Sequence, residues 1–281
     1  MTRFTQRFEE VVRRKTDEAA SSELSPLRTV EAGVTESLQA IGNGWTREKF
    51  DGDFFLTPPG RDLPSTSLVF VQSSDGNTGA RNPSVLGGGL TDKHLIYEGL
   101  SRVAADGVLA GAETIRGSSV IFSVWHPELV ELRRALHLPR HPTQIVATLG
   151  RLTFDDTLLL NVPELPVIVV TTPDWITRMR DELSRRPWIT SIPMDRPDDL
   201  PAAFRAMRAL GMARISAIGG RTIARAMTAA GLIQDLYLTT SPIPGGDPGT
   251  PLYAAPIEGT LIVRKRGTGD EDGVAFEHLV I

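Results

Sequence analysis

The chain of 281 residues contains no cysteine. This absence excludes disulfide frameworks, cysteine-ligated zinc sites, iron–sulfur clusters and cysteine nucleophiles. Positive charge is not in surplus either, because 30 lysine and arginine residues face 34 aspartate and glutamate residues, and the formal net charge is −4. A general electrostatic attraction to nucleic acid or to anionic lipid is therefore not expected.

Long hydrophobic runs are also missing. No run approaches the roughly 20 apolar residues of a membrane-spanning helix. Charged side chains interrupt residues 1–20, so we do not expect a secretory signal there. With 41% hydrophobic and 23% charged residues, the composition is typical of a globular chain that buries a sizeable core. We expect a cytoplasmic protein.

Several chemical motifs are absent as well: the G-x-G-x-x-G fingerprint, the phosphate loop GxxxxGK[ST] and the G-x-S-x-G of α/β hydrolases. His137 and His141 are four residues apart, but Pro139 would break the helix that aligns their rings. We therefore expect no metal site. The neighbouring Arg133 and Arg134 are expected on a solvated helix face.

Residues 1–60 differ in pattern from the rest of the chain. Apolar residues recur at helical intervals between residues 4 and 12 and again between residues 30 and 41, which predicts two amphipathic helices. The turn-rich passage that follows is typical of loops and linkers. We place a boundary near residue 61, which divides the chain into a helical N-terminal extension with a linker (1–60) and a main domain (61–281).

Beyond residue 61, short apolar runs alternate with helical patterns. The runs are rich in valine, isoleucine and leucine on both faces, as buried strands of a mainly parallel sheet require. They span residues 66–72, 107–110, 144–148, 167–171, 214–218 and 235–240. Residues 260–266 and 274–280 are predicted to form an antiparallel pair. The predicted fold class is α/β, with a central mainly parallel sheet of about eight strands, flanking helices and an antiparallel C-terminal strand pair.

Ligands of such sheets bind outside the carboxyl ends of the strands, and three of these ends carry polar or glycine-rich sequences. They are Ser-Ser-Asp-Gly-Asn at residues 73–77, Gly-Ala-Glu-Thr at residues 111–114 and Gly-Gly-Arg-Thr at residues 219–222. Paired glycines before a helix allow a phosphate to approach the backbone at the positive end of the helix dipole. Taken singly, each sequence is also typical of an ordinary turn or helix cap.

In this order and at these separations, the three sequences resemble the motifs of a known family. From about residue 66 to residue 253, the chain is similar to the reductase domain of the bifunctional riboflavin-biosynthesis deaminase/reductase, a member of the dihydrofolate-reductase-like superfamily. That family shows Ser-Leu-Asp-Gly after a strand, then Asp-Ala-Ile-Leu-Val-Gly-x-x-Thr, then Glu-Gly-Gly before a helix. The corresponding segments here begin at Ser73, Asp106 and Ile218.

The resemblance implies a reductase that uses NADPH. It places the cofactor groove at the second and third strand ends. A contact to the adenosine 2′-phosphate is expected after the strand that ends at residue 148, with Arg151 as the candidate. The predicted cofactor-binding residues are Gly111, Thr114, Thr148, Arg151, Gly219, Gly220, Arg221 and Thr222. A solvated surface arginine is the alternative for residue 151.

The same resemblance places Ser73, Asp75 and Gly76 beside the nicotinamide and the substrate. Reduction of a C=N or C=O bond needs a proton for the heteroatom. We expect Asp75 to relay that proton or to orient the substrate, with Glu113 as the second candidate. Turn capping and a solvated carboxylate are the respective alternatives.

Two positions depart from the family. Ile218 replaces the glutamate of Glu-Gly-Gly, and Val69 stands where these enzymes commonly have a lysine. Two groups expected to hold the aminopyrimidine phosphate substrate are therefore missing. The zinc deaminase half is absent too, because its signature needs cysteines.

We therefore predict NADPH-dependent hydride transfer to a heterocyclic or pterin-like small molecule, with the riboflavin-biosynthesis intermediate among the candidates. Dihydrofolate reductase-type activity and a non-catalytic nucleotide-binding protein of the same fold are the alternatives. Because relatives pair through their sheets, the resemblance also implies a homodimer. Neither nucleic acid nor a membrane is an expected partner.

Overall fold

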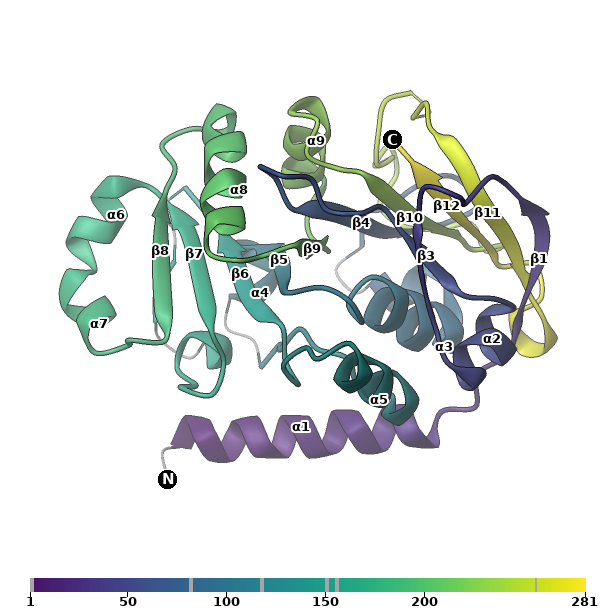
Figure 1. Cartoon of the computed structure of the whole chain (residues 1–281), viewed down its shortest axis with the longest axis horizontal. Coiled ribbons are helices and arrows are strands. Elements are labelled where there is room, and N and C mark those ends of the chain that lie inside the picture. The colour runs from purple at the N-terminus through teal and green to yellow at the C-terminus, as the bar shows by residue number, and fades with distance from the viewer. Residues whose placement is uncertain (1–2, 81–82, 117–118, 150–151, 155–156, 256) are drawn as a thin grey trace.

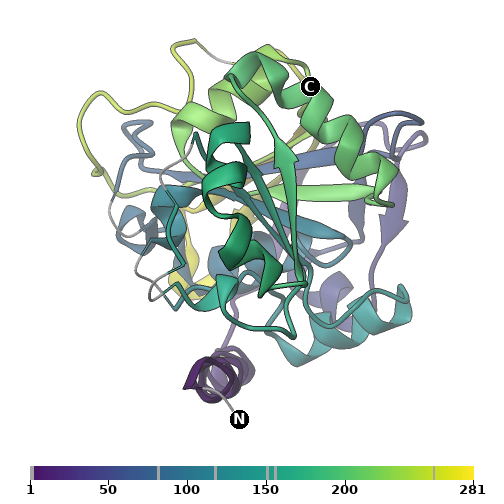
Figure 2. The ribbon, with the colours of Figure 1, turned by 90° about the vertical axis from the view of Figure 1, so that its left-hand side faces the viewer.

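The computed structural model describes residues 3–80, 83–116, 119–149, 152–154, 157–255 and 257–281. Over these residues, ten strands form one sheet with helices on both faces (Figures 1 and 2). The strand order across the sheet is β1-β11-β12-β10-β4-β9-β5-β6-β7-β8. A separate antiparallel pair is formed by β2 and β3.

The elements have the following bounds. The strands are β1 Leu27–Ala32, β2 Gln39–Ile41, β3 Phe54–Leu56, β4 Ser65–Gln72, β5 Gly107–Gly111, β6 Thr143–Ala147, β7 Val167–Thr171, β8 Ile189–Pro193, β9 Arg214–Ala217, β10 Asp235–Thr240, β11 Thr260–Gly267 and β12 Ala275–Val280. The α-helices are α1 Arg3–Ser21, α2 Gly44–Phe50, α3 Gly89–Thr91, α4 Ala112–Ile115, α5 Pro127–Ala135, α6 Pro173–Arg178, α7 Arg180–Ser184, α8 Leu200–Ala209 and α9 Arg221–Ala229. The π-helix η2 spans Asp92–Leu100, and short 3₁₀ turns are η1 Pro83–Leu86, η3 Leu158–Leu160, η4 Pro197–Asp199 and η5 Gly269–Glu271.

The strands from β10 to β8 in the sheet order all pair in parallel. On the other side of β10, the strands β12, β11 and β1 pair antiparallel. All five residues of β7 are buried, because helices cover a parallel sheet on both faces. The α/β fold class, the mainly parallel sheet and the antiparallel C-terminal pair are confirmed.

Two apolar layers flank the sheet. One layer packs α1, η2 and α5 against the sheet and includes Leu95 and Trp125. The other packs α8 and α9 against the opposite face and includes Phe204 and Met227. The carboxyl ends of the strands lie between these layers, at one edge of the sheet.

The helix boundaries follow the sequence signals. Thr172 caps α6, since its hydroxyl accepts a hydrogen bond from the Trp175 amide at 3.3 Å, and Pro173 is the first helical residue. After α8 and α9 the chain turns at Gly211 and Gly231, with φ of 95° and 63°, which glycine adopts most readily. None of the helices in the described segments combines the length and apolar character that a membrane crossing requires.

The predicted helix between residues 30 and 41 is wrong, because this segment contains β1 and β2. Val30 and Val34, two residues of the predicted apolar stripe, are 57% and 71% exposed. The backbone of β1 pairs with β11 instead, and this distant pairing outweighs a weak local periodicity. Residues 1–60 are therefore not purely helical; the boundary near residue 61 stays a prediction. Among the described strands, the sequence interpretation missed β1, β2, β3 and β8.

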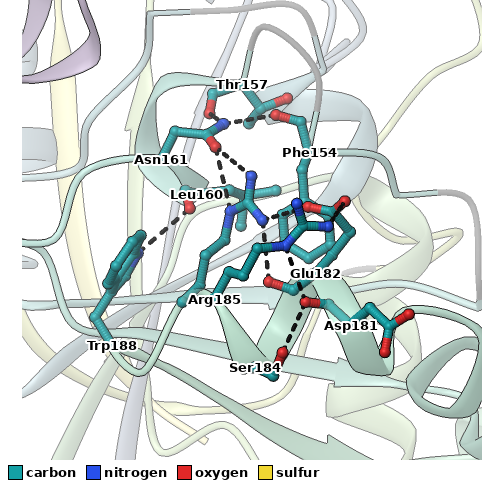
Figure 3. Close-up of polar contacts among 10 residues, drawn as sticks. Phe154, Thr157, Leu160, Asn161, Asp181, Glu182, Ser184, Arg185 and Trp188 are labelled. Carbon is teal, nitrogen blue, oxygen red and sulfur yellow. Dashed lines mark hydrogen bonds and ion pairs between the residues drawn. The ribbon is translucent and has the colours of Figure 1, made fainter. Parts of the chain in front are cut away.

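A polar network ties the loop between β6 and β7 to α7 (Figure 3). The Asn161 side-chain amide donates to the carbonyls of Phe154 and Thr157 at 2.5 and 3.0 Å. Its oxygen accepts from the Arg186 guanidinium at 2.9 and 3.2 Å. Arg186 also pairs with Glu182 at 2.5 Å and lies 4.3 Å from the centre of the Phe154 ring. One amide side chain thus joins two backbone carbonyls to a charged helix end.

We expect Asn161→Ala to lower the free energy of unfolding by about 2–3 kcal/mol, because buried polar groups lose their partners. Ser184 is a matched control: it is exposed in the same network and donates one hydrogen bond, to the Asp181 carbonyl at 2.8 Å. Ser184→Ala should change stability by less than about 0.5 kcal/mol. Urea unfolding measures both, and equal values for the two variants would contradict the role assigned to Asn161.

Candidate functional site

The three strand ends singled out in the sequence meet at one edge of the sheet. In the sheet order, β9 lies between β4 and β5, and all three strands are parallel (Figure 1). Residues 73–77, 111–114 and 219–222 follow β4, β5 and β9 directly. The topology thus brings together segments that are up to about 150 residues apart in sequence, as the rule for parallel sheets predicts.

Gly219 permits a close approach between the ends of β9 and β5. A Cβ atom added at this position would lie 3.1 Å from the Gly111 nitrogen and 3.2 Å from the Ala110 Cα. These are backbone atoms, so they cannot turn aside as a flexible side chain does. Gly111, by contrast, has φ of −75° and open space around its Cα. Position 219 therefore requires glycine, whereas position 111 has room for a side chain.

The chain turns into α9 directly after this contact. Gly220 precedes the helix with φ of 43°, a backbone conformation that favours glycine. Its carbonyl accepts the first helical hydrogen bond, from the Ala224 amide at 3.1 Å. The amides of residues 221–223 form the positive end of a nine-residue helix. This end suits an anionic ligand. Thr222 is exposed there and Arg221 is half-buried.

Arg221 connects this helix to the turn after β4. A Cβ atom added at Gly79 would lie 2.6 Å both from the Arg221 Nη1 atom and from the Thr250 hydroxyl. The Gly79 amide donates to the same hydroxyl at 2.9 Å. The first and third strand ends are therefore in contact, and the predicted positions Arg221 and Gly220 border one common region.

The turn after β4 is bound to the loop after β10. The buried Ser73 hydroxyl donates to the Gly245 carbonyl at 2.8 Å. The Gly245 amide donates to the Asp75 carboxylate at 3.1 Å. Gly76 has φ of 76° and its amide donates to the Ser73 carbonyl at 2.9 Å, as a tight turn requires. Asp75 is otherwise exposed at the edge of the sheet, so its carboxylate caps a loop and also faces solvent.

The second strand end is less organised. Gly111 precedes α4, which has only four residues. The Glu113 side chain is 79% exposed and pairs with Arg116 at 2.9 Å, and Thr114 is exposed. After β6, Thr148 is half-buried and its amide donates to the Val170 carbonyl at 2.9 Å. The predicted 2′-phosphate contact, Arg151, lies outside the described residues.

Both departures from the family pattern are core residues. Ile218 and Val69 are 8% and 3% exposed and belong to the same apolar layer. The Ile218 amide donates to the Leu109 carbonyl at 3.0 Å. Both positions therefore carry hydrocarbon side chains that pack into this apolar layer.

Several polar side chains near the core were not foreseen. Arg133 was expected on a solvated face, and this is wrong: it is 1% exposed and donates to the carbonyls of Arg102, Val103, Ala105 and Pro139. Burial lowers the pKa of Arg133 to about 10. Arg134 is exposed, as expected. Residues 87–89 and the carboxyl group of Asp92 also lie next to the end of β10, through contacts with Ser241 and Thr239. A run of three glycines was the one sequence signal that pointed to them.

Two cavities lie away from the strand ends. One, with about 20 Å³ of space for water, is lined by Ser65, Arg214 and Asp235 at the amino ends of their strands; it has room for about one water molecule. The other lies beside residues 22–26, where the rings of Trp45 and His126 stack 4.1 Å apart. Burial, and then the charges of His94 and Lys49, lower the pKa of His126 to about 4, so this ring is neutral near pH 7. Of the predicted site residues that the structure describes, none lines either cavity.

Comparison with known families gives one match. The model of the RibD C-terminal domain matches residues 66–261. No curated protein matches the chain.

Solved structures share the fold. RibD of Acinetobacter baumannii (form 2) is 16% identical with a TM-score of 0.58, over 78% of this chain and 58% of its own. A pyrimidine reductase-like protein of Corynebacterium diphtheriae is 20% identical with a TM-score of 0.56, over 77% and 91% of the two chains. The riboflavin biosynthesis reductase of Saccharomyces cerevisiae is 17% identical with a TM-score of 0.53, over 79% and 92%. The chain thus spans little more than half of the Acinetobacter protein, and at these identities the likeness establishes the fold.

The contact at Gly219 predicts an asymmetry between two glycines. We expect Gly219→Ala to lower the free energy of unfolding by about 1–3 kcal/mol, because its methyl group meets backbone atoms of β5. Gly111→Ala, the control at the other side of the same contact, should change it by less than about 0.5 kcal/mol, since an alanine fits there without strain. Thermal and urea unfolding of both variants test this, and an equal loss in both would refute the close approach.

Proposed function

The chain belongs to the RibD C-terminal domain family, and we propose that it transfers a hydride from NADPH to a heterocyclic small molecule. The observation that carries this proposal is the meeting of three strand ends that the family match covers, with Gly219 against the backbone of β5. The riboflavin-biosynthesis reductases that the chain resembles use a pyridine nucleotide.

The residues at the third strand end fit such a cofactor. Gly219 lets the end of β9 approach the backbone of β5, and Gly220, with φ of 43°, turns the chain into α9, whose first amides form its positive end. We assign these amides, with Arg221 and Thr222, to the phosphates of the nucleotide. Gly111, Thr114 and Thr148 would line the same groove. NADPH supplies the hydride when it is bound, and the protein supplies orientation and water exclusion.

The first strand end would hold the reacting part of the substrate. Asp75 lies at the open edge, and its carboxylate is fixed by the Gly245 amide at 3.1 Å. We assign to it the orientation of the substrate or the relay of a proton to the reduced C=N or C=O group. Glu113 is the second candidate; its ion pair with Arg116 on the surface favours Asp75 over it.

The proposed substrate is a heterocyclic or pterin-like small molecule, with the riboflavin-biosynthesis intermediate among the candidates. Ile218 and Val69 place hydrocarbon where the resembled enzymes carry charged groups, so a less polar heterocycle or pterin-like molecule fits better. The same two residues favour a second candidate function, a non-catalytic nucleotide-binding protein. NADPH binding without NADPH oxidation across a panel that includes dihydrofolate and the riboflavin-biosynthesis intermediate would support that second function. Assembly as a homodimer is part of the proposal for either function.

Nucleotide binding is the first test. At 100 times its Kd, NADPH should stabilise the fold by about 2.7 kcal/mol, and NADH should stabilise it less at equal concentration. A thermal-shift titration with NADPH, NADH and NADP⁺ measures this. If no nucleotide raises the melting temperature at millimolar concentration, the reductase proposal fails.

Two variants of Asp75 separate its chemistry from its structural role. Asparagine keeps an oxygen for the Gly245 amide but removes the charge and the titrating proton. We expect Asp75→Asn to lower turnover by about 100-fold, as loss of a proton-transfer group does, with little change in NADPH affinity. Asp75→Ala should also loosen the loop after β10. Full turnover in Asp75→Asn would show that Asp75 only caps the loop after β10 and takes no part in the reaction.

A further inference from the structure

The carboxyl groups of Asp92 and Glu271 lie against consecutive glycines. A Cβ atom added at Gly88 would lie 2.7 Å from Asp92 Oδ2, and one added at Gly89 would lie 2.5 Å from Glu271 Oε1. Asp92 begins the π-helix η2, whereas Glu271 comes from the tip of the β11–β12 hairpin. Two acidic groups from distant parts of the chain are therefore held under the same short segment.

These two groups have little to neutralise them. Over the described part of the chain, Asp92 Oδ1 and Glu271 Oε2 are buried and have no hydrogen-bond partner. Glu271 Oε1 accepts from the Thr91 amide at 2.9 Å. The nearest lysine in sequence, Lys93, is bound by Glu18 of α1. An oxygen buried without a hydrogen-bond partner disfavours the charged form of a carboxyl group, and the charge of Glu271 disfavours that of Asp92 further, so Asp92 is the group that retains a proton.

The glycine segment above them reaches the candidate site. A Cβ atom added at Gly87 would lie 2.5 Å from the Ser241 hydroxyl. Ser241 directly follows β10; its amide donates to the Gln72 carbonyl at 2.9 Å and its hydroxyl accepts from the Ile243 amide at 3.0 Å. Residues 87–89 thus touch the same loop that Asp75 caps. The position of residues 87–89 therefore depends on the carboxyl groups of Asp92 and Glu271, which lie against them.

We propose that Asp92 is a positioning residue of the candidate site: its carboxyl group carries a proton, and in this neutral form it lets residues 87–89 lie against the end of β10 beside Glu271. When the proton leaves to solvent, the two carboxylates repel and the segment moves off the loop. The expected change in NADPH affinity rests on the function proposed above. The expected movement of residues 87–89 does not depend on that function.

The surroundings of Asp92 set the pH at which this happens. Burial raises the pKa of Asp92 to about 7; the Thr239 hydroxyl of β10 opposes the shift and the charge of Glu271 adds to it. Tyr97, on the same helix, also interacts with Asp92. Since the folded-state pKa is raised above the ordinary value of 3.8, the folded state binds the proton more tightly than the unfolded chain. Stability from this group is full at low pH and is lost as the pH rises to about 7.

The experiment compares the full-length protein with Asp92→Asn, which mimics the protonated carboxyl group at every pH. Hydrogen exchange at the amides of residues 87–91 and the Kd for NADPH are measured at about pH 6 and about pH 8. One unit on either side of the pKa, the protonated fraction falls from about nine tenths to about one tenth. The Kd of the unmodified protein should therefore rise about tenfold, and its exchange protection at residues 87–91 should fall.

In Asp92→Asn, the Kd should change by less than about twofold between the two pH values, and protection should persist at both. Glu271→Gln removes one of the two causes that raise the pKa of Asp92, so the change should move to lower pH. Asp272→Asn, on the same hairpin but exposed, is the control and should respond to pH as the unmodified protein does.

Equal pH dependence of exchange in the unmodified protein and in Asp92→Asn would overturn the inference. Restoration of protection at about pH 8 by magnesium chloride would also overturn it, because a cation rather than a proton would then neutralise the pair. Absence of NADPH binding at both pH values would count against the proposed function, while exchange at residues 87–91 would still decide the role of Asp92.

Discussion

Parallel pairing of the strands from β10 to β8 is the constraint on which the rest of the structure depends. Because these strands run in one direction, their carboxyl ends meet at one edge, and each pair needs a crossover that covers a face of the sheet. The covered faces must be apolar, which explains why the strands read as continuous hydrophobic runs. The polar and glycine-rich sequences are left for the ends, and the close contact of Gly219 with β5 then fixes how near those ends come to one another.

The sequence was informative where structure is local. Every parallel strand except β8 was predicted, because each of the predicted strands is apolar on both faces. The ends of α6, α8 and α9 follow capping signals. The segment that forms β1 could not be predicted, since nothing in residues 27–32 identifies β11 as their partner. Val30 of β1 and the following Val34, both exposed, fell by chance at helical intervals.

The candidate site divides in the same way. The three strand ends were found from motifs that are continuous in the sequence, and the topology brings them together. The groups that hold them were not found, because Gly245, Ser241 and Glu271 come from loops more than 150 residues away from the turns and helices they support. Arg133 was misjudged for a related reason: its four carbonyl partners become visible only when η2 and α5 are packed together. Burial and long-range hydrogen bonds are properties of the folded chain, and a residue type gives no sign of them.

The pairing of β1 with β11 has a consequence for the order in which the molecule forms. Leu27 lies opposite Gly267, so a loop of about 240 residues must close before these two strands can pair. Contacts between such distant residues slow folding, because a long loop must close before they form. We expect β1 to join the sheet later than β5, β6, β7 and β8, whose mutual pairings join segments much closer in the sequence. Until it pairs, the backbone amides and carbonyls that β1 presents to β11 have no partner in the sheet, which leaves them open to pairing with other chains.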